Sequence, residues 1–65
     1  MSLKPEKRVD LIFEIEKDGW RYHKSKGGHD HYKHPTKKGK VTVPKQVKEV
    51  SGWESKMIRR QAGLK

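Results

Sequence analysis

The sequence contains no cysteine, and this absence removes several kinds of site at once. Without cysteine the chain has no disulfide, no thiolate ligand for a metal ion and no cysteine nucleophile. A chain of this kind fits a reducing compartment, so we expect a cytoplasmic protein. The sequence also has no apolar run as long as a signal-peptide core or a membrane span, which predicts no targeting segment and no membrane partner.

Large aliphatic residues are scarce as well, because Leu, Ile, Val and Phe together fill 12 of the 65 positions. A chain this short buries a smaller fraction of its surface than a larger domain does. We therefore expect a single domain over residues 1–65, without a large substrate pocket. Two Trp and two Tyr provide bulky side chains for a compact core.

Acidic residues are the third scarce group. Eight Asp and Glu stand against 17 Lys and Arg, which gives a formal charge of +9. This excess favours a polyanionic partner, with nucleic acid as the first candidate. Charge alone leaves two alternatives open, namely a solvated surface that happens to be basic and a basic face that meets an acidic protein.

Apolar residues recur at helical spacing near both ends of the chain. The first helix is predicted over residues 5–18, with Pro5 in its first turn and Asp18-Gly19 as its stop. Its apolar stripe consists of Val9, Ile12 and Phe13, widened by Leu11 and Ile15. Ser51-Gly52-Trp53-Glu54 has the spacing of a capping box, which predicts that a second helix begins there and ends before Gly63. The apolar face of this helix consists of Trp53, Met57, Ile58 and Ala62.

Three segments between the helices alternate or are rich in β-branched residues, which predicts strands over 20–25, 29–34 and 40–43. Residues 26–28 and 35–39 form the two turns, and Pro44 ends the third strand. The α-β-β-β-α order indicates an α+β fold, in which a three-stranded antiparallel sheet carries both helices on one face. The other face of the sheet is then open to water.

The period of two sorts the strand residues between these faces. The helix side receives Tyr22, Tyr32, Val41 and Val43. The open side receives Arg21, His23, Ser25, His29, His31, Lys33, Lys40 and Thr42. Pairing Tyr22 with Tyr32 leaves a three-residue loop of Lys26, Gly27 and Gly28, and it places Ser25 opposite His29.

An open face of this kind suits RNA cleavage. RNA carries its own nucleophile, the 2′-hydroxyl, and needs from a protein mainly a proton acceptor or donor and positive charge on the phosphate. The imidazole of His29 can exchange the proton near neutral pH, and Lys33, Arg21 or Lys26 can hold the phosphate. Spacing alone also allows the alternative that His29 is an ordinary surface residue.

Several blocks of the sequence resemble one known family. They are Asp18-Gly19-Trp20, Lys26-Gly27-Gly28-His29-Asp30-His31-Tyr32, Lys33-His34-Pro35-Thr36, Gly39-Lys40-Val41-Thr42-Val43-Pro44 and Arg60-Gln61-Ala62-Gly63-Leu64. In this order, from about Glu6 to Leu64, the chain resembles the HicA (YcfA-like) mRNA interferase toxins of type II toxin-antitoxin systems.

The resemblance implies a fold like that of double-stranded-RNA-binding domains and a toxin that acts in stress responses. It also implies a metal-independent endoribonuclease, without cofactor, that cleaves mRNA and does not require the ribosome. The family has one essential His in a Gly-Ser-His signature, which by position is His29. This chain departs from the signature at Gly28, where the family usually has Ser, and at Asp30, where a second His or another polar residue is common. The implied partner is a HicB-type antitoxin, through which any contact with DNA is indirect.

On this basis His29 is the predicted catalytic residue. The predicted RNA-binding residues are Arg21, Lys26, Gly27, Gly28, His31, Lys33, Lys37, Lys38 and Lys40. His34 points to the opposite sheet face from His29 and His31, and no carboxylate lies among the outward residues, so we predict no metal site.

Four residues outside the predicted site have structural or auxiliary roles. Asp30 lies on the inward side by parity, and its expected role is to bond local amides at the hairpin end, with a catalytic partnership with His29 as the open alternative. Trp20 is expected in the core, and Trp53 is expected to anchor the second helix. His23, like His31, is expected to be a surface residue that can touch RNA, and a part of either residue in proton transfer stays open as an alternative.

Two other function classes stay open. A non-catalytic RNA-binding module would keep the basic face without needing the His29 imidazole. A DNA-binding or protein-interaction domain ranks last, because no helix-turn-helix pairing is visible.

Overall fold

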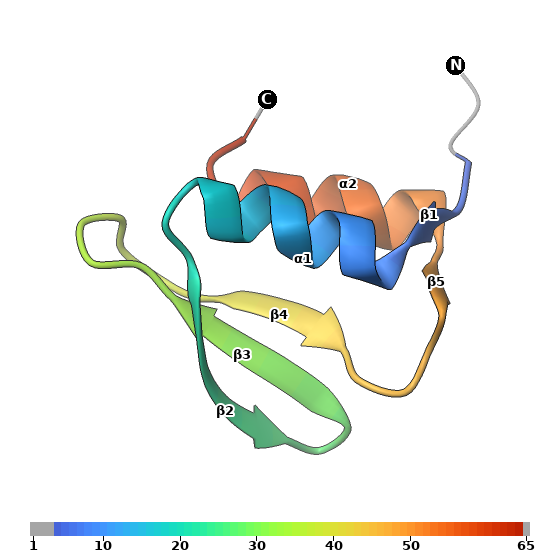
Figure 1. Ribbon diagram of the computed structural model, residues 1–65, viewed down its shortest axis with the longest axis horizontal. Helices are drawn as coiled ribbons and strands as arrows, with labels where there is room; N and C mark the ends of the chain where they lie inside the picture. The colour runs from blue at the N-terminus through green and yellow to red at the C-terminus, as the bar shows by residue number, and fades with distance from the viewer. Residues whose placement is uncertain (1–3, 65) are drawn as a thin grey trace.

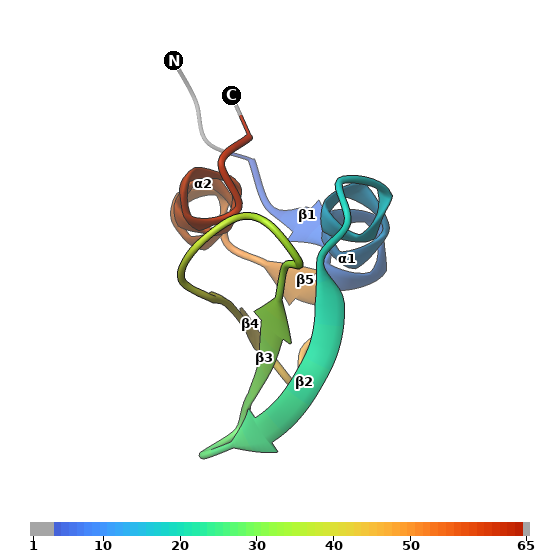
Figure 2. The same cartoon turned by 90° about the vertical axis from the view of Figure 1, so that its left-hand side faces the viewer.

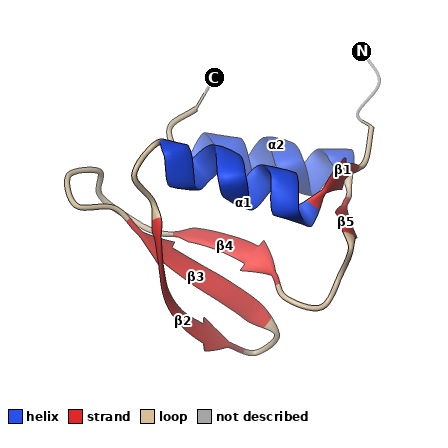
Figure 3. Ribbon diagram, in the orientation of Figure 1, coloured by secondary structure: helices blue, strands red, loops and turns tan. Residues whose placement is uncertain are grey.

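In the computed structural model, which describes residues 4–64, the elements follow the predicted order with one addition at each helix (Figure 1). They are β1 (Glu6–Lys7), α1 (Arg8–Lys17), β2 (Arg21–Lys26), β3 (His29–Lys33), β4 (Val41–Pro44), β5 (Glu49–Val50) and α2 (Gly52–Gln61). Strands β2, β3 and β4 form an antiparallel sheet in that order, and both helices lie on one side of it (Figure 3). The predicted α+β fold with three antiparallel strands is confirmed.

The two short strands were not predicted. β1 and β5 pair antiparallel, with Glu6 opposite Val50 and Lys7 opposite Glu49. The predicted first helix was therefore too long at its start, since Pro5 precedes β1 and the helix begins only at Arg8. Because β1 leads into α1 and β5 leads almost directly into α2, this pair holds the beginnings of both helices together (Figure 1).

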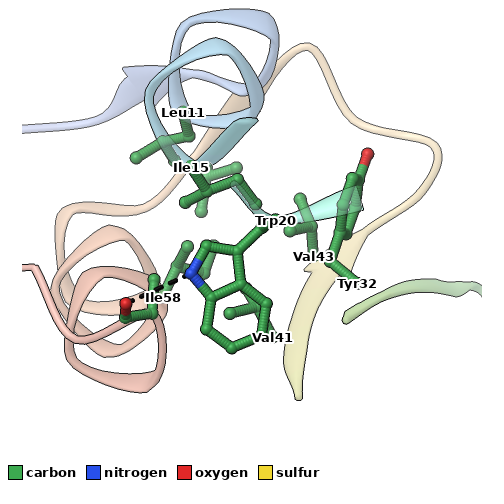
Figure 4. Packing of buried hydrophobic residues seen from close by; sticks show 9 residues of the cluster. Leu11, Ile15, Trp20, Tyr32, Val41, Val43 and Ile58 are labelled. Atoms are coloured by element: carbon green, nitrogen blue, oxygen red, sulfur yellow. Dashed lines mark hydrogen bonds between the residues drawn. The ribbon is translucent and has the colours of Figure 1, made fainter. Parts of the chain in front are cut away.

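The core lies between the helices and the sheet and is centred on Trp20 (Figure 4). Its indole Nε1 donates a hydrogen bond of 3.2 Å to the carbonyl of Ala62, which fixes the end of α2 against the start of β2. The predicted core position of Trp20 and the predicted inward orientation of Tyr32 and both valines of β4 are confirmed. Tyr22 pairs with Tyr32 as predicted, but its side chain is 57% exposed and does not join the core. The buried hydrophobic residues are Leu11, Ile15, Trp20, Tyr32, Val41, Val43, Val50, Ile58 and Ala62.

The predicted helix faces were partly wrong. On α1 the buried stripe is Leu11 and Ile15, one turn apart, whereas Val9 and Phe13 lie two positions away and are each 65% exposed. Two positions along a helix correspond to about 200° of rotation, so both sets cannot face the core. On α2 the same geometry turns Trp53 to solvent, where it is 62% exposed, and it does not anchor the helix.

The start of α2 follows its sequence signal. The hydroxyl of Ser51 accepts a hydrogen bond of 3.1 Å from the backbone N–H of Glu54, as a capping residue does. The Glu54 carboxylate accepts a bond from the same hydroxyl at 3.3 Å. No helix in residues 4–64 combines the length and the apolar character that crossing a bilayer requires.

Candidate functional site

His29 begins β3 directly after the turn of the β2-β3 hairpin, whose tip points away from both helices (Figure 2). Gly27 and Gly28 have φ angles of 59° and 80°, and Lys26 pairs with His29. Positive φ at both central residues is the requirement of a tight two-residue hairpin turn, and glycine meets it without steric cost. The loop thus has two residues, and the prediction of a three-residue loop was wrong.

The His29 ring is exposed, and one of its nitrogens is held. Nδ1 lies 3.2 Å from the carbonyl oxygen of Gly27. A carbonyl oxygen only accepts hydrogen bonds, so Nδ1 carries the hydrogen, and Nε2 of the neutral ring keeps its lone pair. The turn itself is tied to the sheet, because the amide of Lys45 donates to the carbonyl of Gly28 at 2.9 Å. His29 is therefore an exposed proton acceptor on a fixed support.

A β-bulge in β2 changes which side chains surround His29. The register between β2 and β3 shifts between Tyr22 and Lys24, so that Lys24 pairs with His31 and Ser25 pairs with Asp30. The prediction that Ser25 lies on the open face opposite His29 was wrong, because one extra residue in a strand reverses the orientation of all that follow. Because of the bulge, Lys24 and Lys26 lie on the same face as His31 and His29, and Ser25 lies on the opposite face. We call the resulting surface the basic face, and it consists of Lys24, Lys26, His29, His31 and Lys40.

His31 lies at the centre of the basic face and is only 9% exposed, although it was predicted at the surface. It is on the middle strand, between Lys24 of β2 and Thr42 of β4. Its Nδ1 is buried and makes no hydrogen bond with the described residues. Burial lowers the pKa of His31 below its ordinary value, and the nearby positive charge of Lys40 and Lys24 lowers this pKa further. The ring is therefore neutral at neutral pH.

Asp30 lies on the opposite side of β3, beneath the basic face, and is buried. Its carboxylate forms a hydrogen-bonded ion pair with the Arg8 guanidinium. It also accepts a hydrogen bond from the Ser25 hydroxyl. Since that hydroxyl donates to Asp30, it accepts the bond of 2.9 Å that joins it to Tyr22. Asp30 thus fastens the hairpin to the start of α1, and the prediction that it bonds local amides was wrong.

The other predicted RNA-binding residues are spread over the molecule. Lys33 and Lys38 are exposed but lie outside the basic face as defined above. Arg21 instead donates from its guanidinium to the carbonyls of Glu16 and Trp20, at the end of α1. The ammonium of Lys37 contacts the Asp18 carboxylate and the Ala62 carbonyl, so it serves the packing of the helix ends.

His34 has a structural role on the other side of the sheet from the basic face. Its ring packs edge-on against Trp20 with centroids 5.2 Å apart. Its Nδ1 accepts from the amides of Thr36 and Lys37, and its Nε2 donates to the Asp18 carbonyl at 2.7 Å. No group of three or more His, Asp or Glu side chains suited to hold a metal ion is found in residues 4–64.

Sequence reasoning missed Lys24 as a site residue, and no signal in the sequence marks the bulge that exposes it beside His31. It also missed a pocket beside His29, which is lined by Thr42, Pro44, Glu54, Met57, Ile58 and Gln61. Those residues belong to β4 and to α2, and the sequence offers no measure of how close a helix lies to a strand edge.

A comparison with curated proteins gives no match. A family model described as "HicA toxin of bacterial toxin-antitoxin" matches residues 9–64, which run from the second residue of α1 through the end of α2. The match spans the hairpin, the basic face and the pocket together. The chain therefore belongs to the HicA toxin family and is the toxin of a bacterial toxin-antitoxin system.

Proposed function

We propose that this toxin is an endoribonuclease that cleaves mRNA without the ribosome and that His29 transfers the proton in the reaction. One observation carries the proposal. His29 is exposed, its Nδ1 is held by the Gly27 carbonyl, and its Nε2 keeps a lone pair for a substrate. A general base must present an accessible lone pair in a fixed orientation, and this ring does so.

The surroundings of His29 suit a phosphodiester. Lys26 pairs with His29, and Lys24 pairs with His31 on the same face. Their ammonium groups attract the phosphate and balance the negative charge that grows on it during the reaction. The neutral His31 ring adds a hydrogen-bond donor among these cations. Because its buried Nδ1 has no hydrogen-bond partner among residues 4–64, we place the hydrogen of the neutral ring on Nε2.

The proposed reaction needs no nucleophile from the protein. Nε2 of His29 takes the proton of the ribose 2′-hydroxyl, and the 2′-oxygen attacks the adjacent phosphorus. The bond from phosphorus to the 5′-oxygen then breaks, and that oxygen takes a proton from water. The products are a 2′,3′-cyclic phosphate and a 5′-hydroxyl, and His29 returns to its neutral form by losing its proton to water.

The partner expected for this surface is an antitoxin of the HicB type. A protein with a formal charge of +9 is complementary to an acidic partner, and such a partner placed over the basic face would exclude RNA. Contact with DNA would then be indirect, through the antitoxin.

The test is cleavage of an unstructured RNA by the wild-type chain and by His29→Gln, with a chelator present. We expect wild-type cleavage that leaves a cyclic phosphate end and a loss of at least about 100-fold in His29→Gln, with RNA binding retained. His23→Gln is the matched control, because His23 is also an exposed histidine of the hairpin but lies at the bulge. It should cleave like the wild type.

The outcomes separate the remaining function classes. Cleavage by the wild type and by His29→Gln alike would reject His29 as the proton acceptor. RNA binding without cleavage by any variant would favour the non-catalytic RNA-binding module. Loss of cleavage on addition of chelator would reject a metal-independent reaction.

A further inference from the structure

A pocket of about 170 Å³ opens between β4 and α2, beside the basic face. His29, Thr42 and Pro44 line it from the sheet, and Glu54, Met57 and Gln61 line it from the helix. β4 is the edge strand of its sheet, and the amide of Thr42 donates to Oε1 of Gln61 at 3.2 Å. This bond ties α2 to the strand edge. It uses the amide oxygen of Gln61, so the NH₂ group remains a donor for a ligand.

The pocket shares His29 with the basic face. A group that enters the pocket is therefore a near neighbour of whatever group lies at the His29 ring. If a scissile phosphate lies at His29, the part of the RNA that reaches the pocket is an adjacent nucleotide. The pocket is smaller than the roughly 300 Å³ at which pockets for larger ligands begin, so it suits one base and not a whole nucleotide.

Charge narrows the choice of ligand further. Glu54 brings a carboxylate to the pocket, and a carboxylate repels phosphate but accepts hydrogen bonds from N–H groups. The Ser51 hydroxyl donates to Oε1 of Glu54 at 3.3 Å and so helps to orient the group. A nucleobase with N–H donors is the part of RNA that fits, with Met57 and Pro44 beside its apolar ring faces.

Among the four bases, guanine presents two donors side by side, N1–H and the 2-amino group. Both can reach one carboxylate, and the O6 acceptor beside them can take a bond from the Gln61 NH₂ group. Adenine and cytosine place a single amino donor next to an acceptor nitrogen, and that nitrogen would face a carboxylate oxygen without a hydrogen between them. Uracil has only one N–H donor, with a carbonyl on each side of it.

We propose that this pocket is the subsite for a guanine base next to the scissile phosphate and that Glu54 is the residue that selects it. The inference rests on the ribonuclease function proposed above and adds a base preference to it.

The test uses oligouridine RNAs that carry one guest base, either guanine, inosine or adenine. Inosine differs from guanine only in lacking the 2-amino group. We expect the wild type to cleave a bond beside guanine with a kcat/KM at least about tenfold above that for either other guest. In Glu54→Gln the kcat/KM values for the three guest bases should differ by no more than about twofold. The side-chain amide has one acceptor oxygen and one NH₂ donor group, so it cannot accept hydrogen bonds from both guanine donors with two oxygens as a carboxylate does. Gln is also tolerated at this position of a helix start, so the variant should fold.

Glu49→Gln is the matched control, since it makes the same chemical change at an exposed position of β5 outside the pocket. It should keep the guanine preference of the wild type. The inference is overturned if Glu54→Gln keeps that preference or if the wild type has none. Either result leaves the ribonuclease function standing, provided that cleavage still depends on His29.

A binding measurement keeps the inference testable if no RNA is cleaved. Trinucleotides with 2′-O-methyl groups cannot be cut, because the nucleophile is blocked. The protein is titrated with the 2′-O-methyl trinucleotides UGU and UIU, where I is inosine, and binding is followed by NMR. Binding should shift the backbone amide signals of Met57 and Gln61, and UGU should bind at least about fivefold more tightly than UIU. Equal affinity of the two trinucleotides would contradict the guanine subsite.

Discussion

His31 shows how the burial of one side chain sets a protonation state within a site. Its pKa lies below the ordinary value of 6.5, first because of burial and then because Lys40, Lys24, His29 and Lys26 add positive charge around it. Between the lowered pKa and 6.5 the unfolded chain binds more protons than the folded chain. The stability that this histidine contributes is therefore complete above about pH 6.5 and is lost as the pH falls toward its folded pKa.

We accordingly expect acidification to destabilise the protein partly through His31. The free energy of unfolding, measured in urea at about pH 7.5 and about pH 5, should fall less in His31→Gln than in the wild type, because Gln does not titrate. His23→Gln is the control, because it makes the same chemical change at an exposed histidine outside the basic face. An equal fall in all three proteins would show that His31 does not titrate below its ordinary pKa. NMR titration of the ring would give that pKa directly.

Gly28 is a second residue whose local conformation decides the effect of a change. Its φ of 80° is left-handed, and a Cβ built there meets no atom within 4 Å. A side chain at this position would therefore destabilise the protein through the unfavourable backbone conformation and not through a steric clash. We expect Gly28→Ser and Gly28→Ala each to lower the free energy of unfolding by about 1 kcal/mol. A loss in one variant but not in the other would contradict a purely backbone origin.

At the scale of elements, the ion pair between Arg8 and Asp30 joins the first residue of α1 to β3. Both side chains are largely buried, at 18% and 11% exposure, and Arg8 also donates to the carbonyl of Pro44. Removing one partner leaves the other charge buried without compensation. We expect Asp30→Ala to lower the free energy of unfolding by about 3 kcal/mol, as measured by urea denaturation.

A double-mutant cycle tests the origin of that loss. Arg8→Met combined with Asp30→Ala should cost less than the sum of the two single changes, by about 1–3 kcal/mol, because the double variant has no unpaired charge. Strict additivity would mean that the two residues act separately. Asp10→Ala removes an exposed acidic side chain in the first turn of α1 and should change the free energy of unfolding by less than about 0.5 kcal/mol.

Sequence periodicity predicted the helices and the three long strands, but it did not predict the exact pairing between strands or the buried face of each helix. The capping box at Ser51 and the inward valines of β4 follow from local rules, so they were predictable. The bulge after Tyr22 has no such signal, because it depends on how β2 must bend over β3. Strands of two residues are too short to show an alternating pattern in the sequence, so the pairing of β1 with β5 could not be predicted. The size of Trp53 suggests burial, but α2 faces the core through the buried residues Ser55, Ile58 and Ala62 instead.

At the scale of the whole molecule, the positive charge should act mainly through phosphates. Release of counterions makes RNA affinity fall with salt, and each neutralised phosphate of a single strand adds about 0.7 to the slope of log K against log salt concentration. The basic face concentrates two lysines of one strand opposite two histidines of the next. These lysines, and not the excess charge in general, should account for a measurable part of the slope.

Lys24→Gln and Lys26→Gln should therefore each weaken binding of an unstructured RNA and reduce that slope by about 0.7, with little dependence on base sequence. Binding is measured by fluorescence anisotropy across a series of salt concentrations, with His29→Gln as the background so that the RNA stays intact. Lys56→Gln is the control, because Lys56 is exposed on α2 and removes the same charge elsewhere. If the slope falls equally in all three variants, RNA is attracted by the net charge of the molecule, and the basic face is not its binding surface.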